Sequence, residues 1–238
     1  MLEVNNLYHG DCLEVMKNID DKSIDMILCD LPYGTTQNKW DSIIPLNLLW
    51  NQYERVIKDN GAIVLTAQTP FDKFLGYSNL KLLKYEWIWE KQQGTGHLNA
   101  KKMPLKNHEN ILIFYKNLPT YNPQMRAGKP YICKSGKGSS NYGDQVSVTT
   151  INTGERYPLS VIEFDYDRNK LHPTQKPVAL FEYLIKTYTN EGDLVLDNCA
   201  GSGTTAIACL NTKRNYIGIE KEQKYIDIAN ERIKKLNA

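Results

Sequence analysis

The stretch DLVLDNCAGSGTTAIACL, residues 193–210, combines a short apolar run, a glycine-rich turn and a second apolar run. The first run predicts a strand that ends at Asp197, and the second predicts a helix that begins near Thr204. A strand, a glycine loop and a helix in this order bring the backbone close to a ligand at the helix N-terminus. The next strand, residues 215–220, ends in Glu220, whose carboxylate can accept hydrogen bonds from both hydroxyls of a ribose. The pattern predicts a nucleotide site in an α/β fold.

Several ligands are compatible with such a loop. The spacing from Gly201 through Gly203 to Ala206 fits the glycine pattern of a nicotinamide dinucleotide site. Against that ligand, Asp197 would face a pyrophosphate badly, and the loop lacks the G-K-[ST] ending of a phosphate-binding P-loop. S-adenosylmethionine fits better, because it offers an amino group to Asp197, a ribose to Glu220 and no phosphate. From these residues alone, a methyltransferase and other nucleotide binders remain equally open.

Short apolar runs of this kind recur along the chain and are typical of buried strands in a mostly parallel sheet. The seven predicted strands are residues 5–9, 25–29, 62–67, 85–90, 110–115, 193–196 and 216–219. Helical patterns separate many of them, at residues 11–19, 45–58, 176–188, 204–212 and 223–236. Strands that alternate with helices predict a doubly wound α/β fold with a mostly parallel seven-stranded sheet.

The region 118–169 interrupts this alternation. It is rich in Gly, Pro, Ser, Asn and Tyr, and its apolar runs are weak. We expect it to form an inserted recognition lobe within a single domain that spans residues 1–238.

Basic residues gather in the middle of the chain. The whole chain carries a formal charge of +2, yet nine lysines and arginines between Lys91 and Tyr142 are opposed by a single acid, Glu109. A basic segment on an acidic body favours a polyanionic partner such as nucleic acid. Taken alone, however, such a run more commonly means a solvated lysine-rich surface.

Composition argues against several classes of protein. Of the 238 residues, 41% are apolar and 24% are charged, which is ordinary for a globular protein in water. No apolar run approaches the length of a bilayer span, and the N-terminus lacks a signal-peptide pattern, so we expect a cytoplasmic protein. The five cysteines form no C-x-x-C pair, which argues against a zinc site, and reduced thiols fit the cytosol.

A second informative stretch is SIDMILCDLPYG, residues 23–34, which places an acid and an aromatic ring directly after a buried strand. Turn chemistry explains its proline and glycine, but it explains neither Asp30 nor Tyr33. If this strand lies beside the strands at residues 193–219, both loops open at the carboxyl edge of one sheet, where ligands of α/β sheets bind.

Five motifs together resemble a known family. DLPYG at 30–34 resembles the D-P-P-Y motif of amino-directed DNA methyltransferases, and LDNCAGSGTT at 196–205 resembles their methionine-binding motif. HPTQKP at 172–177 is similar to the segment that leads into the helix before that motif. HGDCL at 9–13 and NHENILIFYK at 107–116 are also typical of the family. The order of catalytic motif, recognition region and cofactor motif matches the β class of N6-adenine and N4-cytosine DNA methyltransferases.

The resemblance covers nearly the whole chain except residues 118–169. It implies a Rossmann-like fold dependent on S-adenosylmethionine, with circularly permuted motifs, and an enzyme that acts on double-stranded DNA, as in restriction–modification systems. Related enzymes often dimerise, so a homodimer is compatible with it. No metal and no membrane are implied. The chain departs from the family at Leu31, where proline is usual, but the role at this position uses a backbone carbonyl that leucine also supplies.

The resemblance also implies catalytic roles for Asp30, Leu31, Pro32 and Tyr33. The Asp30 carboxylate and the Leu31 carbonyl would accept hydrogen bonds from the exocyclic amino group of the target base and aim its lone pair at the methyl donor. Pro32 would rigidify the turn, and Tyr33 would stack on a flipped-out base. Asp30 as the first residue of the motif favours N6 of adenine over N4 of cytosine. An RNA methyltransferase and a non-catalytic nucleic-acid binder are the remaining alternatives.

The expected cofactor site is assembled from segments far apart in the sequence. Its implied residues are Asp11, Cys12, Asp30, Thr174, Lys176, Pro177, Asp197, Ala200, Gly201, Ser202, Gly203, Thr204, Thr205 and Glu220. For Asp11, a helix N-cap is an equally good interpretation, because it opens a helical run.

Candidate nucleic-acid contacts come from the basic segment. Lys101, Lys102 and Lys106 would meet phosphates, which position a protein on DNA without reading its sequence. Arg126, Lys134, Lys137, Asn141 and Gln145 are candidates to reach base edges. The residues Trp87 and Trp89 share one strand face, and we expect them in the core.

Overall fold

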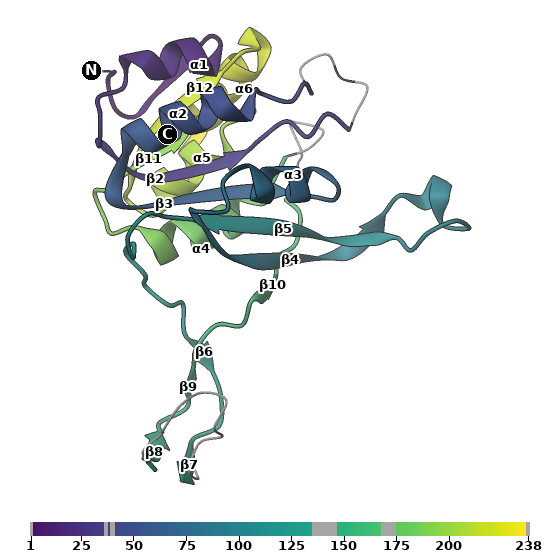
Figure 1. Cartoon of the computed structure of the whole chain (residues 1–238), viewed down its shortest axis with the longest axis vertical. Helices are drawn as coiled ribbons and strands as arrows, with labels where there is room; N and C mark the ends of the chain where they lie inside the picture. The colour runs from purple at the N-terminus through teal and green to yellow at the C-terminus, as the bar shows by residue number, and fades with distance from the viewer. Residues whose placement is uncertain (1, 36–37, 39–40, 135–146, 168–174, 237–238) are drawn as a thin grey trace. The chain divides into compact units, whose positions relative to one another are not determined.

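The computed structural model describes residues 2–35, 38, 41–134, 147–167 and 175–236. The chain divides into two compact units, one formed by Met1–Asn122 with Ser160–Ala238 and the other by Pro123–Leu159. Among the described residues, the centre of the larger unit is an eight-stranded sheet (Figure 1). In spatial order its strands are β1 (Asn6–His9), β12 (Asn215–Glu220), β11 (Leu194–Asp197), β2 (Ile24–Asp30), β3 (Ile57–Ala67), β5 (Lys106–Phe114), β4 (Leu83–Thr95) and β10 (Val161–Glu163).

Most neighbouring strands of this sheet are parallel, and of these strands only β5 runs antiparallel to its neighbours β3 and β4. The strands β11 and β2 are adjacent, with Val195 opposite Met26 and Leu196 opposite Ile27. Their carboxyl ends therefore meet at one edge of the sheet, as expected for the glycine loop and the turn after Asp30.

Helices cover both faces of the sheet (Figure 1). The helices α1 (Cys12–Val15), α2 (Leu46–Val56) and α3 (Phe71–Ser78) pack on one face, in a core that includes Leu49, Tyr53 and Leu75. The helices α4 (Val178–Tyr188), α5 (Thr204–Asn211) and α6 (Gln223–Leu236) pack on the other face, which includes Leu180 and Ala208. Alternate residues of each central strand enter the two cores, because successive side chains of a strand point to opposite faces. The predicted doubly wound α/β fold is confirmed.

All seven predicted strands are present, and the structure adds elements that the patterns did not predict. The eighth strand, β10, has three residues, of which Val161 and Glu163 are exposed and Ile162 is half-buried. The helix α3 follows β3 where no helical pattern was predicted. The strand β4 continues past residue 90 to Thr95 because it pairs with β5, although its last residues are polar. Trp87 and Trp89 are buried in the core, as predicted.

The described residues of the smaller unit form two short antiparallel pairs of strands. The strand β7 (Tyr131–Lys134) pairs with β8 (Thr149–Asn152), and β6 (Arg126–Ala127) pairs with β9 (Glu155–Arg156). The predicted lobe at 118–169 extends beyond this unit on both sides. On one flank, the Asn122 side chain donates to the carbonyls of Lys186 and Thr189 in the larger unit. The recognition role of the lobe stays a prediction.

Within the described residues, no helix is both long enough and apolar enough to cross a bilayer. The same residues contain no group of three or more His, Cys, Asp or Glu side chains arranged to hold a metal ion.

Candidate active site

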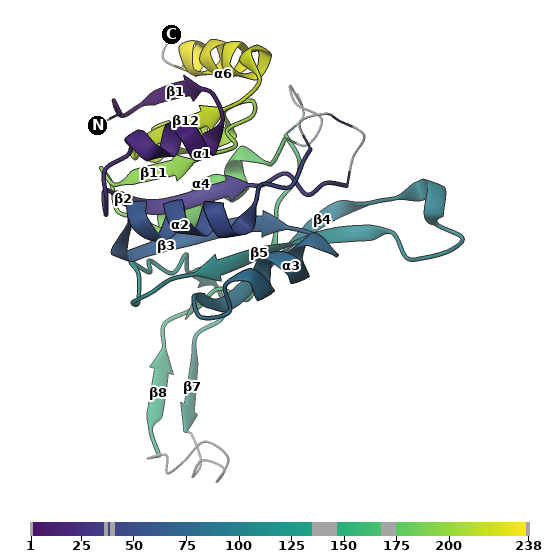
Figure 2. The same cartoon turned by 45° about the horizontal axis from the view of Figure 1, so that its top comes forward.

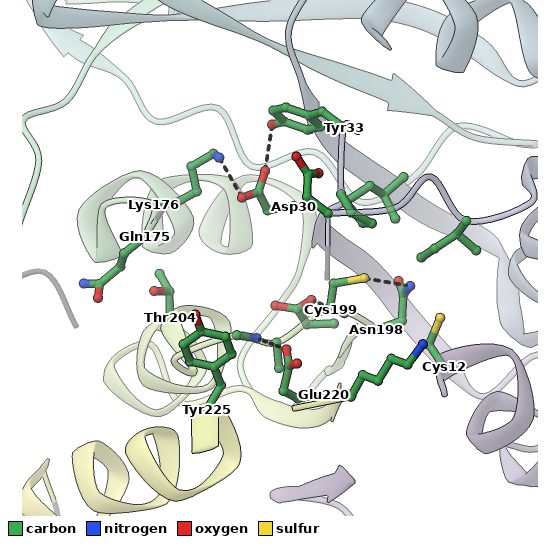
Figure 3. A pocket seen from close by; sticks show the side chains of 18 of the residues that line it. Cys12, Asp30, Tyr33, Gln175, Lys176, Asn198, Cys199, Thr204, Glu220 and Tyr225 are labelled. Carbon is green, nitrogen blue, oxygen red and sulfur yellow. Dashed lines mark hydrogen bonds and ion pairs between the residues drawn. The ribbon is translucent and has the colours of Figure 1, made fainter. Parts of the chain in front are cut away.

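A cavity of about 470 Å³ opens at the carboxyl edge of the sheet (Figure 3). This volume lies within the usual range for small-molecule and cofactor sites. The cavity is lined by the majority of the predicted site residues, namely Asp11, Cys12, Asp30, Leu31, Pro32, Tyr33, Lys176, Asp197, Ala200, Gly201, Ser202, Thr204 and Glu220. Segments more than 160 residues apart in the sequence thus form one wall, because their strands are neighbours in the sheet.

The glycine loop links β11 to α5 and holds Asp197 at its base. Asp197 is 4% exposed and accepts hydrogen bonds from the Cys199 amide, at 3.0 Å, and from the Thr205 hydroxyl. Burial is the main cause that raises the pKa of Asp197 from 3.8 to about 6. Gly203 has a φ of +81°, and a Cβ there would lie 2.7 Å from the Cβ of Ala229, so this turn requires glycine. The result is a buried carboxylate close to the cavity, suited to a cationic partner.

Glu220 ends β12 on the same wall (Figure 3). Its two carboxylate oxygens accept the amides of Gly201 and Glu222, each at 2.8 Å. Each oxygen keeps a lone pair for a further donor, as a pair of ribose hydroxyls would require. Glu220 and Tyr225 both line the cavity, so the predicted ribose acceptor has an aromatic neighbour.

Asp11 has two roles in this geometry. Its carboxylate accepts the Leu13 amide at 2.9 Å and caps α1, which confirms the N-cap interpretation. Asp11 also lines the cavity, so the cofactor contact implied by the resemblance remains compatible with its position.

Asp30 lies at the carboxyl end of β2 and has three donors around it. Its Oδ1 accepts the hydroxyls of Tyr33, at 2.7 Å, and Thr66, at 2.5 Å. Its Oδ2 accepts the Lys176 ammonium at 2.6 Å. The Tyr33 ring stacks on Phe71 with centroids 5.4 Å apart, and burial raises the pKa of Tyr33 well above its usual value, so its hydroxyl stays protonated and donates. The carboxylate is therefore fixed in orientation.

Leu31, the departure from the family pattern, has a buried side chain that is 3% exposed and packs in the core of the α1, α2 and α3 face. Leucine thus fills the core at a position where the expected role belongs to the backbone.

A buried chain of alternating charges continues from Asp30 into the protein. Lys176 also approaches Glu109, with 3.2 Å between Nζ and Oε2, and Glu109 pairs through Oε1 with Lys91 at 2.5 Å. The side chains of Lys176, Glu109 and Lys91 are only 6%, 8% and 4% exposed. Burial alone would raise the pKa of Glu109, but the two ammonium groups hold it below its usual value. Burial likewise opposes the charge of Lys176, but Asp30 and Glu109 raise its pKa above its usual value. Glu109 and Lys176 are therefore both charged at neutral pH.

Sequence reasoning missed three residues of the network of hydrogen bonds and ion pairs around Asp30, namely Thr66, Glu109 and Lys91. A signal for Glu109 was present: it is the single acid of the basic segment and lies two residues before the buried apolar run that begins at Ile111. It also missed Gln175, which accepts the Ser202 hydroxyl at 3.2 Å and donates to Asp167 at 2.9 Å.

Three predicted cofactor residues support the cavity without lining it. Pro177 precedes α4, Gly203 precedes α5, and Thr205 donates to Asp197. Thr174 lies outside the described residues.

The predicted nucleic-acid contacts are dispersed. Lys101 and Lys102 are exposed between β4 and β5, whereas the ammonium of Lys106 donates to the Thr69 carbonyl at 3.1 Å. In the smaller unit, Arg126 donates to the Tyr157 carbonyl, and Lys134 is exposed at the end of β7. Lys137, Asn141 and Gln145 lie outside the described residues.

Comparisons with known proteins agree with this site. A family model described as DNA methylase, for N6 and N4 methyltransferases, matches residues 24–231. The type II methyltransferase M.BglII of Bacillus subtilis is 30% identical over 95% of this chain and 68% of its own length. The DNA adenine methyltransferase YhdJ of Escherichia coli is 28% identical over 97% of this chain and 83% of its own.

Two solved structures of methyltransferases also resemble this chain. The complex of M1.HpyAVI with S-adenosylmethionine has a TM-score of 0.66 and 25% identity, over 95% of this chain and 98% of that one. The cytosine-N4-specific PvuII DNA methyltransferase shares the fold, with a TM-score of 0.72 and 16% identity over 95% of this chain and 85% of that one. S-adenosylmethionine is the cofactor, and the buried Asp197 and the amide-held Glu220 fit its ammonium and its ribose. The chain belongs to the N6/N4 family of DNA methyltransferases.

Proposed function

We propose that the protein transfers a methyl group from S-adenosylmethionine to the exocyclic N6 of adenine in double-stranded DNA, with the target base flipped out of the helix. The observation that carries this proposal is the placement of Asp30 and the glycine loop around one cavity. An aspartate at the first position of the motif supports adenine. N4 of cytosine is the second candidate, because a cytosine-N4 enzyme shares the fold and the two amino groups are chemically alike.

The cofactor supplies an electrophilic methyl group when it is bound. The Asp197 carboxylate would hold its ammonium, Glu220 would accept its ribose hydroxyls, and Lys176 would face its carboxylate. These three groups lie on separate elements of the carboxyl edge, so the protein fixes both ends of the ligand.

The chemical role of Asp30 is to accept a hydrogen bond from the amino group of the base. The lone pair of that nitrogen is delocalised into the ring, and an acceptor on its N–H group makes the lone pair more available. Tyr33 and Thr66 hold Oδ1, so Oδ2 and the Leu31 carbonyl are the acceptors offered to the substrate. Preorganised acceptors of this kind can supply a large part of a rate enhancement.

Lys176 occupies Oδ2 in the present arrangement, and we propose that Glu109 makes its movement possible. Because Nζ is already 3.2 Å from Glu109, the ammonium keeps a buried carboxylate partner when it leaves Asp30. Lys91 in turn balances the charge of Glu109. The substrate amino group can then reach the Asp30 carboxylate, and the buried ammonium of Lys176 still has a carboxylate partner.

Parallel incubations with labelled S-adenosylmethionine and either mixed-sequence duplex DNA or RNA, followed by nucleoside analysis, test the proposal. We expect N6-methyladenine. N4-methylcytosine in its place would select the second candidate, and transfer to RNA but not to DNA would overturn the assignment of the substrate.

A further inference from the structure

The hairpin formed by β4 and β5 continues beyond the sheet as a two-stranded arm, residues 92–107 (Figure 2). Since β4 is antiparallel to β5, and β5 is antiparallel to β3, β4 runs parallel to β3 and β2. Its carboxyl end therefore leaves the sheet at the edge that carries the cavity. Lys91 and Thr95 line that cavity, so the arm begins at the active site.

The arm has no core of its own. Except for the half-exposed Gly94, all its residues are exposed. It contains no acid, and it carries Lys101, Lys102 and Lys106. A bare hairpin of this kind gains little stability from its own packing. The positive charge of the arm is complementary to a polyanion. We therefore infer that its partner is the DNA that the proposed function requires.

An apolar side chain stands at the tip of this basic arm. Leu98 has a relative exposure of 101%, the highest of any large apolar residue among those described. It lies in a 3-10 turn, His97–Asn99, in which the Asn99 amide donates to the Gly96 carbonyl at 2.9 Å and the Ala100 amide donates to the His97 carbonyl at 3.1 Å. The turn is entered through Gly96, whose φ of +93° favours glycine. An ordered turn thus presents Leu98 to the solvent.

We propose that Lys101 and Lys102 of the arm contact DNA phosphates and that Leu98 inserts into the base stack where the flipped base has left a gap. This inference rests on the proposed function. Leu98 follows the cavity-lining Thr95 by three residues, a reach of at most about 10 Å, which is comparable to the depth of a DNA groove. Apolar wedges of this kind stabilise unstacked base steps in other DNA-binding proteins. The base in the cavity and the wedge in the gap would then be held by one continuous hairpin.

Methylation kinetics on two duplexes test this role. Both contain the recognition site, as identified by sequencing DNA methylated in an expression host. One duplex is fully paired, and the other has an abasic position opposite the target base, which lowers the cost of flipping. The variants are Leu98→Ala, the conservative Leu98→Met, and Leu80→Ala as the matched control. Leu80 is 60% exposed and precedes the opposite end of β4.

We expect Leu98→Ala to lower kcat/KM about tenfold or more on the paired duplex, and less than about threefold on the abasic duplex. Leu98→Met should retain the wild-type ratio between the two duplexes, and Leu80→Ala should match the wild type on both. Because Leu98 is fully exposed, the loss cannot be ascribed to a damaged core.

The outcomes separate the two proposals. If the wild type methylates neither duplex, the proposed function is wrong, and so is the proposed insertion of Leu98. If the wild type methylates both, and Leu98→Ala equals it on the paired duplex, only the wedge is overturned. An equal loss for Leu98→Ala on both duplexes would also overturn it, since a general contact does not depend on the cost of flipping.

Discussion

Two pairs of lysines differ in their exposure to solvent and in the charged groups around them. Lys91 and Lys176 lie inside the larger unit, nearly excluded from solvent, and alternate with Glu109 and Asp30 at distances of 2.5 to 3.2 Å. Lys101 and Lys102 lie exposed on an arm that contains no acid. The buried pair fixes the geometry around one carboxylate, because each buried charge needs its partner. The exposed pair is suited to long-range attraction, which salt screens.

The largest effect on the transfer rate should follow from removing the charge of Asp30, the carboxylate at the end of the buried series of alternating charges. Asp30→Asn keeps the shape of the side chain but loses its charge, and Lys176 retains Glu109 as a partner. We expect the transfer rate to fall about a hundredfold to a thousandfold, with the protein still folded. Single-turnover kinetics and calorimetric titration with S-adenosylmethionine separate the two steps. A loss of cofactor affinity as large as the loss of rate would contradict this division of roles.

Glu109→Gln should have the next largest effect. It leaves the buried Lys91 without its carboxylate partner and leaves Lys176 with Asp30 alone, so Asp30 becomes harder to free. We expect a stability loss of about 3 kcal/mol or more and a fall in kcat of about tenfold to a hundredfold.

The readout that identifies Glu109 as a positioning residue is a loss in kcat with an unchanged KM for DNA, partly restored by Glu109→Asp. Glu90→Gln is the matched control, because Glu90 is an exposed acid on the neighbouring strand β4. A variant that loses only stability, with wild-type kcat at low temperature, would reduce Glu109 to a structural role.

The pH dependence of cofactor binding should be smaller and reports on Asp197. With a pKa of about 6, this carboxyl is ionised above pH 6 and takes up a proton below it. Binding of a cationic amino group should therefore weaken as pH falls, about tenfold between pH 8 and pH 5. The folded pKa is raised above the usual 3.8, so the same group destabilises the free protein as pH rises toward 6. Titration calorimetry should show the first trend in the wild type and a flat, weak profile in Asp197→Asn.

The smallest effect belongs to the exposed pair. Replacing Lys101 and Lys102 by alanine should weaken DNA binding several-fold at low salt, with kcat unchanged at saturating DNA. The slope of log affinity against log salt should fall by about 1 for each lysine. An unchanged slope, measured by fluorescence anisotropy, would mean that the arm does not contact phosphates.

Local sequence motifs predicted the loops that form the site, whereas contacts between residues far apart in the sequence were not predicted. The glycine loop and the turn after Asp30 were predictable because strand, turn and helix signals lie within a few residues of one another. The chain from Lys91 through Glu109 to Lys176 was not, because its partners are 18 and 67 residues apart and meet only through the strand order of the sheet. The arm was missed for a related reason: residues 92–95 are polar and resemble a loop, but β5 pairs with them at Thr95.

The identity of the methylated base is the decisive measurement for adenine methylation that depends on Asp30. The chain and its Asp30→Asn variant would each be expressed in a host without DNA methylation, and the nucleosides of the host DNA would be separated by mass spectrometry. We expect N6-methyladenine with the wild type and only a trace with the variant. Wild-type DNA that carries no methylated base, or equal methylation with Asp30→Asn, would contradict this expectation.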